Sequence, residues 1–409
     1  MQIKKYADWF MKSWNECSTR APLSLVDTYT RKDKLSCEAR TEEFLKKIRK
    51  GQNKDHKTRG NNPGSAKISF TDIRDFFKSA LNYEDSHLDI VFSAGFRKST
   101  NKFMEKGRKF DPDMSTEDIF QASRNVWIIN GIQSMMGLPV KLTPSIFAYS
   151  MLYPYTDNYL DDPSISRKEK TIFSRRFKRR INGEKITPAN NAEKNIFDLI
   201  GIIEKQYERL AYPDVYRSLL AIHDSQTKSV SLLDASDSLS ETDVLKICIE
   251  KGGTSVLADG YLVSGFLTEA QRRFLFNYGA YLQLADDIQD TYKDLEAGLL
   301  TIFSRACRQT PLDELTNRTF NIGTRIMEQI NCFNGSNLNS MKSLMEKSIK
   351  ILIIESIGFN NKFYSKSYTQ NIESYSPFRF SYLRKNRGSL SSGPGLFAEV
   401  VKESVSLDD

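Results

Sequence analysis

The sequence predicts an all-α protein built as a single large helical bundle, and three observations support this. Apolar residues recur at helical spacing along most of the chain, and no segment shows the period-two alternation of a β-strand. Helix start signals, in which Ser or Thr precedes an acidic residue or Gln by three positions, stand at Ser115, Ser240 and Thr268.

Local signals place the helices of the N-terminal half. The expected elements are helices at 4–16 and 38–49, a polar linker at 51–67, and helices from Thr71, from Ser115 to 137 and from Pro144 to Asp162. Pro144 suits the first position of a helix. A kink is expected at Pro154, and Pro163 ends the helix because it disfavours the α conformation at the residue before it.

The C-terminal half continues the helical pattern. The expected helices span 193–210, 213–228, Ser240 to a break at Gly252-Gly253, Thr268 to Gly298, a helix from Asp313, and 338–357. After about residue 362 the chain is polar and Ser-rich, which is typical of a loose tail. The expected organisation is an N-terminal helical extension with its linker (1–67), one large domain (68–362) and a flexible tail (363–409).

Composition excludes several classes of protein. The 409 residues carry 59 Lys and Arg against 51 Asp and Glu, a net charge of +8. No apolar run is long enough to span a membrane, and the first residues lack the apolar core of a secretory signal. The five Cys are scattered without a CxxC pair and only three His occur, which argues against a zinc site and predicts a cytoplasmic protein. Chemistry is therefore expected from carboxylates, Lys, Arg or a metal.

The first candidate motif is the acidic segment 155–162, YTDNYLDD. Asp157 and Asp161 are four residues apart, so they share one helix face about 5–6 Å apart. Asp162 stands beside them at the helix end, where the helix dipole disfavours anions. A bound cation would offset both penalties. The plainer interpretation is a solvated helix end.

The second candidate motif is 283–294, QLADDIQDTYKD. Asp286, Asp290 and Asp294 form a stripe roughly 12 Å long on one helix face, with Asp287 beside it. The stripe continues backward through the apolar residues Leu282 and Tyr278, so these carboxylates are expected to be partly buried and neutralised by metal or base. Alternatively, the acidic face simply emerges from the core.

Two acidic clusters on two helices suit Mg²⁺, which prefers a few carboxylates, water and substrate phosphate oxygens. The scarcity of His favours such an oxygen-only site over zinc. Together the clusters predict a clamp for a diphosphate group. The expected metal ligands are Asp157, Asp161, Asp162, Asp286, Asp287, Asp290 and Asp294, with Asp157, Asp161, Asp286 and Asp290 as the catalytic residues.

These motifs resemble those of the class I isoprenoid synthase superfamily. DNYLDD is close in layout to the DxxEDD form of squalene and phytoene synthases. The Gln-x-x-Asp-Asp-x-x-Asp core from Gln283 to Asp290 is similar to that of trans-prenyl diphosphate synthases, whereas the Asp286, Asp290, Asp294 spacing is that of the second motif of terpene cyclases. The resemblance implies an all-α fold with a central apolar cavity, and three Mg²⁺ ions that bind an isoprenyl diphosphate and release it as a carbocation.

Departures from these patterns leave undecided which branch of the superfamily the sequence resembles most. Asn158 and Leu160 stand where the two forms of the first motif have acids, and the second motif has Asp at all three triad positions. The spacing that ends at Asp294 and the aromatic faces favour a terpene synthase that cyclises or rearranges the cation. The alternative is a prenyltransferase, either chain-elongating or head-to-head.

A leaving diphosphate also needs cations. The candidates are Lys251, Lys293, Arg167 and Lys168. Lys251 precedes a Gly-Gly pair, which is similar to the basic residue and helix break that meet the diphosphate in the superfamily. For each of them, a solvated surface charge is the plainer interpretation.

A carbocation needs an inert cavity with aromatic faces, which stabilise cations by about 0.5–2 kcal/mol. The candidate lining residues, which precede the two motifs at helical spacing, are Tyr149, Tyr153, Tyr278 and Leu282. Tyr153 resembles the residue that limits product length in prenyl synthases. Ordinary core packing is the alternative for each. His223 and Gln226 lie on a helix that could line the same cavity, although a structural role for His223 is the simpler interpretation.

The run 167–180 holds eight bases and one acid. It fits a solvated basic face, with attraction of an anionic substrate or peripheral contact with a lipid surface left open. A non-enzymatic basic helical protein that binds nucleic acid or membrane is the alternative function for the chain. No nucleic-acid partner is expected, because the run lacks a recognised module. The superfamily resemblance leaves a homodimer open.

Overall fold

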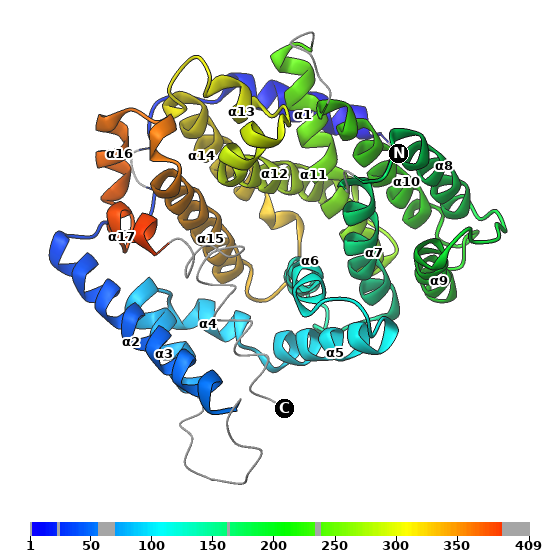
Figure 1. Cartoon of the computed structure of the whole chain (residues 1–409), viewed down its shortest axis with the longest axis horizontal. Helices are drawn as coiled ribbons and strands as arrows, with labels where there is room; N and C mark the ends of the chain where they lie inside the picture. Colours follow the sequence, from blue (N-terminus) through cyan, green and yellow to red (C-terminus); the bar gives the residue numbers. More distant parts are fainter. Residues whose placement is uncertain (1, 23–24, 56–69, 162–163, 234–238, 387–409) are drawn as a thin grey trace.

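The computed structural model describes residues 2–22, 25–55, 70–161, 164–233 and 239–386. Within these residues the protein is helical throughout and contains no strand, which confirms the all-α prediction. Figure 1 shows α11 and α12 near the centre, α8 and α9 at one edge, and α2 to α4 with α15 to α17 at the other.

The helices have the following bounds. In the N-terminal half they are α1 Ile3–Glu16, α2 Arg31–Asp55, α3 Phe70–Leu81, α4 Asp85–Val91, α5 Ala94–Phe110, α6 Thr116–Met135, α7 Pro144–Asp161, α8 Arg167–Ile181 and α9 Asn191–Gln206. In the C-terminal half they are α10 Pro213–Ser229, α11 Glu241–Ser264, α12 Glu269–Ala297, α13 Ile302–Ala306, α14 Asp313–Met327, α15 Leu338–Phe359, α16 Lys366–Glu373 and α17 Phe380–Lys385. Short 3₁₀ turns lie at η1 Val230–Leu232, η2 Ile330–Cys332 and η3 Asn361–Phe363.

The predicted helix starts are confirmed. Ser115 Oγ accepts from the backbone N–H of Asp118 at 3.0 Å, and Ser240 Oγ accepts from that of Asp243 at 3.1 Å. Thr268 and Gln271 form the reciprocal capping box of α12. Such caps satisfy N–H groups that have no partner inside the helix.

The predicted break at Gly252-Gly253 is wrong, because α11 is continuous from Glu241 to Ser264. Both glycines instead allow α12 to approach. A Cβ on Gly252 would lie 2.4 Å from the carbonyl oxygen of Gly279, and a Cβ on Gly279 would lie 2.2 Å from that of Gly252. A Cβ on Gly253 would meet the ring of Phe276 at 2.7 Å. Backbone contact between α11 and α12 therefore fixes the centre of the bundle.

The N-terminal helix α1 packs on the central helices. Tyr6, Phe10 and Trp14 are buried in the common core, and Lys5 and Tyr6 both donate to Glu269 at the start of α12. The expected extension is thus part of the same packed body. The division of the chain at residues 67 and 362 remains a prediction.

The chain beyond residue 362 differs from the loose tail that we expected. Residues 366–385 form α16 and α17, in which Tyr368, Phe380 and Leu383 are buried. Arg379 makes a bidentate ion pair with Glu38 of α2, with a shortest distance of 2.6 Å. The polar composition predicted a loose tail, but the apolar and aromatic side chains spaced along this segment are buried in the core. Residues 387–409 lie outside the described part.

Across the described part of the chain, no helix combines the length and the apolar character needed to cross a membrane.

Candidate active site

The first acidic motif lies on the last turns of α7. This helix is continuous through Pro154 up to Asp161. Thr156 Oγ1 donates to the carbonyl of Leu152 at 2.9 Å. The side chains of Asp157 and Asp161, and the whole of Asp162, lie outside the described residues. The structure therefore locates the motif by its helix and by Leu160, whose side chain is buried.

The second acidic motif lies near the C-terminal end of α12, as predicted. Asp286 is exposed, Asp290 is partly buried, and Asp287 and Asp294 are only 4 % and 9 % exposed. Asp290 pairs with Lys293 at 2.9 Å. The acidic stripe therefore runs from the surface into the core, and most of its carboxylates have lost much of their water.

Burial changes the protonation of these carboxylates. Loss of hydration raises the pKa of Asp287 to about 7, although Gln283 Nε2 donates to its Oδ1 at 2.9 Å. Burial, and then the nearby carboxylates, raises the pKa of Asp294 to about 8. Surrounding protein atoms, and then Asp290, also raise the pKa of Asp286, even though part of that side chain reaches solvent. The effect of burial on these pKa values exceeds that of the nearby positive charges.

Two basic side chains approach the cluster from neighbouring helices. Lys251 on α11 lowers the pKa of Asp286, Asp287 and Asp294, so its ammonium group faces the motif. Arg124 on α6 lowers the pKa of Asp286 in the same way. These contributions are smaller than the effect of burial, and the site as a whole still disfavours further negative charge.

The donor set fits a hard divalent cation. Asp287 Oδ2 is buried and has no hydrogen-bond partner among the described residues, so a strong acceptor is left unsatisfied. Within the described residues no three Asp, Glu, His or Cys side chains converge into a ready-made ion site. Mg²⁺ commonly binds through one or two carboxylates together with water and substrate phosphate. The residues present therefore fit Mg²⁺ bound with a diphosphate.

One pocket, called the polar pocket for its Lys251, Gln283 and Asp287, is lined by Leu160 of the first motif and Asp287 of the second, while Asp286, Asp290 and Asp294 do not line it. It encloses about 680 Å³, its open mouth included, and Leu160, Lys251 and Asp287 all line it. The other lining residues are Gln226, Ser229, Val230, Leu232, Leu233, Cys248, Gln283, Leu299 and Thr301. Because Leu160 belongs to the first motif and Asp287 to the second, the end of α7 forms the wall opposite α12.

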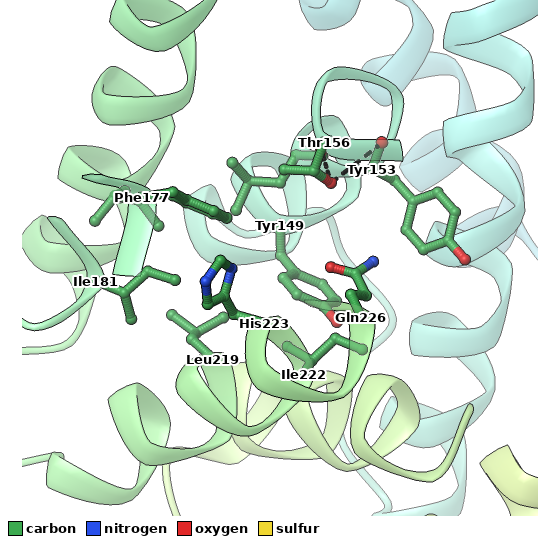
Figure 2. A pocket seen from close by; sticks show the side chains of 11 residues that line it. Tyr149, Tyr153, Thr156, Phe177, Ile181, Leu219, Ile222, His223 and Gln226 are labelled. Carbon is green, nitrogen blue, oxygen red and sulfur yellow. Dashed lines mark hydrogen bonds between the residues drawn. The ribbon is translucent and has the colours of Figure 1, made fainter. Parts of the chain in front are cut away.

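An aromatic pocket lies further along α7, between α7, α8, α9 and α10. It encloses about 380 Å³, its mouth included, and is lined by Tyr149, Leu152, Tyr153, Thr156, Phe177, Ile181, Ile200, Leu219, Ile222, His223 and Gln226. Figure 2 shows the ring of Tyr149 between the side chains of His223 and Gln226, while the ring of Tyr153 points away from them. Tyr149 and Tyr153 therefore line this pocket, and their contact with a substrate stays a prediction.

His223 is a wall residue of this pocket and is also satisfied structurally. Its Nε2 lies 3.2 Å from Ser174 Oγ, and its ring meets Phe177 edge-on at 5.2 Å. Burial lowers its pKa to about 4. At neutral pH the imidazole is therefore uncharged.

Several predicted residues lie elsewhere. Arg167 and Lys168 lie on the exposed first turn of α8 and line neither pocket. Tyr278 is buried and stacks on Phe274 at 6.0 Å, which is ordinary core packing. Leu282 is partly buried beside the core and lines neither pocket.

The basic run on α8 is partly explained by neighbouring acids. Four of its bases form ion pairs, namely Arg176 with Glu193, Lys178 with Asp224, Arg179 with Glu184 and Arg180 with Glu204. The Arg176 and Arg180 pairs are largely buried. Three of these pairs join α8 to α9 or α10, and the Arg179 pair is local, so the run presents less charge to a partner than the sequence suggested.

Arg124 and Cys248 lie near the acidic cluster although the sequence patterns did not predict them. Arg124 is a single cation within an apolar stretch of α6, and that contrast was the available signal. Cys248 precedes Lys251 by three residues and so shares its helix face. Burial, and then the adjacent Asp287 carboxyl, raises the pKa of its thiol.

Comparisons with known proteins gave matches only among solved structures. No protein-family model and no curated protein matched the sequence. The geranylgeranyl pyrophosphate synthetase of Pyrococcus horikoshii Ot3 is 15% identical with a TM-score of 0.36, covering 71% of this chain and 97% of that one. The polyprenyl synthetase of Streptomyces coelicolor A3(2) is 12% identical with a TM-score of 0.32, covering 68% and 98%.

A third structure, a geranylgeranyl pyrophosphate synthase, is 17% identical with a TM-score of 0.32, covering 82% of this chain and 96% of that one. Because these TM-scores are below 0.5, the functional assignment rests on the site itself.

Proposed function

We propose that the protein is a Mg²⁺-dependent class I isoprenoid synthase that ionises an isoprenyl diphosphate. The observation that carries this is the shared polar pocket, which joins Leu160 of the first motif, Asp287 of the second and Lys251 of α11. A diphosphate and Mg²⁺ together supply the charges and oxygen ligands that this pocket lacks.

Each polar side chain has a distinct task in this proposal. Asp286, Asp287 and Asp290 would hold Mg²⁺ together with carboxylates of the first motif, and Mg²⁺ would supply positive charge to the departing diphosphate. Lys251 binds the diphosphate oxygens and remains in contact with them as their charge increases. Gln283 orients Asp287 through its 2.9 Å hydrogen bond.

We further propose that the cation is transferred to a second substrate, which makes the protein a prenyltransferase. This replaces the cyclase that the sequence favoured. The cyclase interpretation requires Asp294 as the third metal ligand, yet its carboxyl is buried and does not line the polar pocket. The Gln283–Asp287 hydrogen bond instead engages both ends of the Gln-x-x-Asp-Asp core, which resembles that of trans-prenyl synthases.

Product analysis tests both parts of the proposal. The protein is incubated with Mg²⁺ and isoprenyl diphosphates of ten to twenty-five carbons, with and without isopentenyl diphosphate. A longer diphosphate, or a product that forms only from two substrates, supports transfer. A hydrocarbon or alcohol from one substrate alone would indicate a cyclase.

Variants separate catalysis from a binding role. Asp286→Asn and Asp290→Asn are expected to lower turnover at least about 100-fold, since each removes charge where the leaving group departs. Asp198→Asn, on the exposed face of α9, is the matched control and should keep full turnover. Unchanged turnover in both site variants would rule out the clamp, whereas no Mg²⁺-dependent turnover in the wild type would favour a non-enzymatic binding protein.

A further inference from the structure

We infer that the end of the bundle where α12 begins docks on a lipid bilayer, into which Leu210 and Phe266 insert. The docking surface consists of two loops, 207–212 between α9 and α10 and 265–268 between α11 and α12. The inference goes beyond the proposed function and does not depend on it.

The two loops carry the most exposed large apolar side chains in the described part of the chain. Leu210 is 91 % exposed and Phe266 is 68 % exposed, and Tyr212 is also exposed. Single exposed apolar residues are common on protein surfaces, whereas neighbouring ones on two separate loops indicate an interaction site.

Packing holds the two loops side by side. A Cβ on Gly265 would lie 2.7 Å from the ring of Tyr212. Tyr207 Oη donates to the carbonyl oxygen of Leu262 at 2.9 Å, and the rings of Tyr207 and Tyr212 meet edge-on at 5.0 Å. Phe266 therefore follows a glycine that touches the other loop, and the exposed side chains form one surface.

Hydrogen bonds fix the conformation of both tips. The carboxylate of Glu208 accepts from the backbone N–H groups of Leu210 and Ala211, at 3.0 and 2.8 Å. Phe266 lies between the left-handed glycine that ends α11 and the threonine that caps α12. Because both turns are already ordered, docking loses little conformational entropy.

The charges beside the tips are balanced. Asp214 pairs with Arg217 at 2.9 Å. Glu269 pairs with Lys5 at 2.7 Å and with Arg272 at 3.1 Å. The acidic motif of α12 lies about 25 Å further along that helix. Such a surface fits the zwitterionic head groups of phosphatidylcholine, and its binding does not require anionic lipid.

The size and shape of this surface favour a bilayer over a second copy of the chain. A stable protein interface buries about 800 Å² per partner, which three side chains on two turns cannot supply. Apolar and aromatic side chains that project from turns instead reach the boundary between head groups and acyl chains, where Leu, Phe and Tyr are stabilised.

The test measures binding of the full chain to phosphatidylcholine vesicles by sedimentation, at low and high salt. Wild-type binding should be the same at both, because insertion of apolar side chains is not screened by salt. The double variant Leu210→Glu, Phe266→Glu should bind at least about tenfold more weakly. Leu35→Glu, which changes an exposed apolar side chain on α2, is the control and should bind like the wild type.

A second readout detects insertion directly. The emission of Phe266→Trp, less that of the wild type, should shift to the blue on vesicles and be quenched by brominated lipid. Thermal melting verifies that the variants, which are changed only at exposed positions, are folded.

Three results would overturn the inference. The first is a wild type that does not bind these vesicles. The second is binding that high salt removes and the double variant retains, which would indicate attraction through the basic run 167–180. The third is a wild-type dimer in dilute solution that the double variant converts to a monomer, which would show that a second copy covers the tips.

Discussion

The buried ring of His223 affects both the local packing and the pH dependence of the free energy of unfolding. Its Nε2 lies near Ser174 Oγ, which in turn lies 2.9 Å from Thr227 Oγ1, so the ring joins α10 to α8. Burial opposes its protonation in the folded state. Acidification should therefore destabilise this junction before it affects more exposed groups.

We predict that His223→Gln reduces the acid sensitivity of the protein. The folded pKa of His223 is about 4 against an ordinary value of 6.5, so the unfolded chain binds more protons between these values. The unfolding free energy therefore falls as pH drops from about 6.5 to 4, by on the order of 3 kcal/mol at most. Urea unfolding of both proteins at pH 4.5 and 7 measures the effect. An equal loss in the variant would contradict it.

Lys251 links the acidic cluster to the proposed substrate. We predict that Lys251→Gln weakens binding of inorganic diphosphate in Mg²⁺ about tenfold, because the variant loses a charge that faces Asp287 in the polar pocket. Calorimetry measures the change. Lys246→Gln, on the same helix but paired with Asp8 of α1, is the control and should bind normally. If both variants bind alike, Lys251 has no part in diphosphate binding.

At the scale of elements, the contact between α11 and α12 positions the site. Gly252 and Gly279 bring the two backbones together, and the adjacent Lys251 and Gln283 then line one pocket with Asp287. A larger side chain at either glycine would push the helices apart. The glycines thus control how the cationic and acidic sides of the site meet.

We predict opposite effects of two Gly→Ala substitutions in helices. Gly252→Ala should destabilise the protein by several kcal/mol, because its Cβ would lie 2.4 Å from a backbone oxygen that cannot easily move. Gly131→Ala in α6 has nothing within 4 Å of the new Cβ and should stabilise by up to about 1 kcal/mol. Denaturant unfolding of the two variants checks the signs. Destabilisation of equal size would mean that the close approach is not the cause.

The sequence was sufficient to predict helices whose ends are marked by residues close together in the chain. Caps at Ser115, Ser240 and Thr268 fixed three helix starts, since capping depends on residues three positions apart. The break at Gly252-Gly253 was predicted wrongly because a glycine pair reads locally as a helix breaker. The glycines instead make room for the facing helix α12, and the spacing of residues along the sequence does not show which helix lies opposite.

The candidate site was predictable only in part for the same reason. The stripe from Asp286 to Asp294 follows from helical periodicity. The depth of Asp294, the approach of Arg124 and the double lining by Gln226 depend on which helices pack together. Tyr149 and Tyr278 precede the two motifs at equivalent spacing, yet of the two pockets described Tyr149 lines one and Tyr278 lines neither.

At the scale of the whole molecule, segments distant in sequence enclose the central helices. Helix α1 covers α11 and α12 from one side, while α2 lies beside α17 and is joined to Arg379 through Glu38 (Figure 1). One hydrophobic core extends from Tyr6 to Leu383. Ionisation of the buried carboxylates Asp287 and Asp294 should therefore lower the free energy of unfolding of the whole protein, because α12 belongs to this single core.

We predict that the metal-free protein loses stability as pH rises. The folded pKa values of Asp287 and Asp294, about 7 and 8, exceed the ordinary 3.8, so the folded state holds more protons than the unfolded chain between about pH 4 and 8. Their stabilisation is complete below pH 4 and is lost as pH rises through this window. Each unit of pKa shift corresponds to about 1.4 kcal/mol, so deprotonation of both groups lowers the free energy of unfolding by on the order of 10 kcal/mol at most. Because His223 acts in the opposite direction below pH 6.5, the cleanest measurement is thermal melting between pH 6.5 and 8.

Magnesium and inorganic diphosphate should reverse this loss. Mg²⁺ binds the ionised carboxylates, so binding to the folded state raises the melting temperature most at pH 8, where deprotonation otherwise costs stability. The double variant Asp287→Asn, Asp294→Asn should melt almost independently of pH between 6.5 and 8 in EDTA, and the single variant Asp287→Asn should respond less to Mg²⁺ with diphosphate. Asp198→Asn should behave like the wild type. A wild-type protein whose melting temperature in EDTA is the same at pH 6.5 and 8 would show that these two carboxylates are not held in the strained, proton-binding state from which the metal site was inferred.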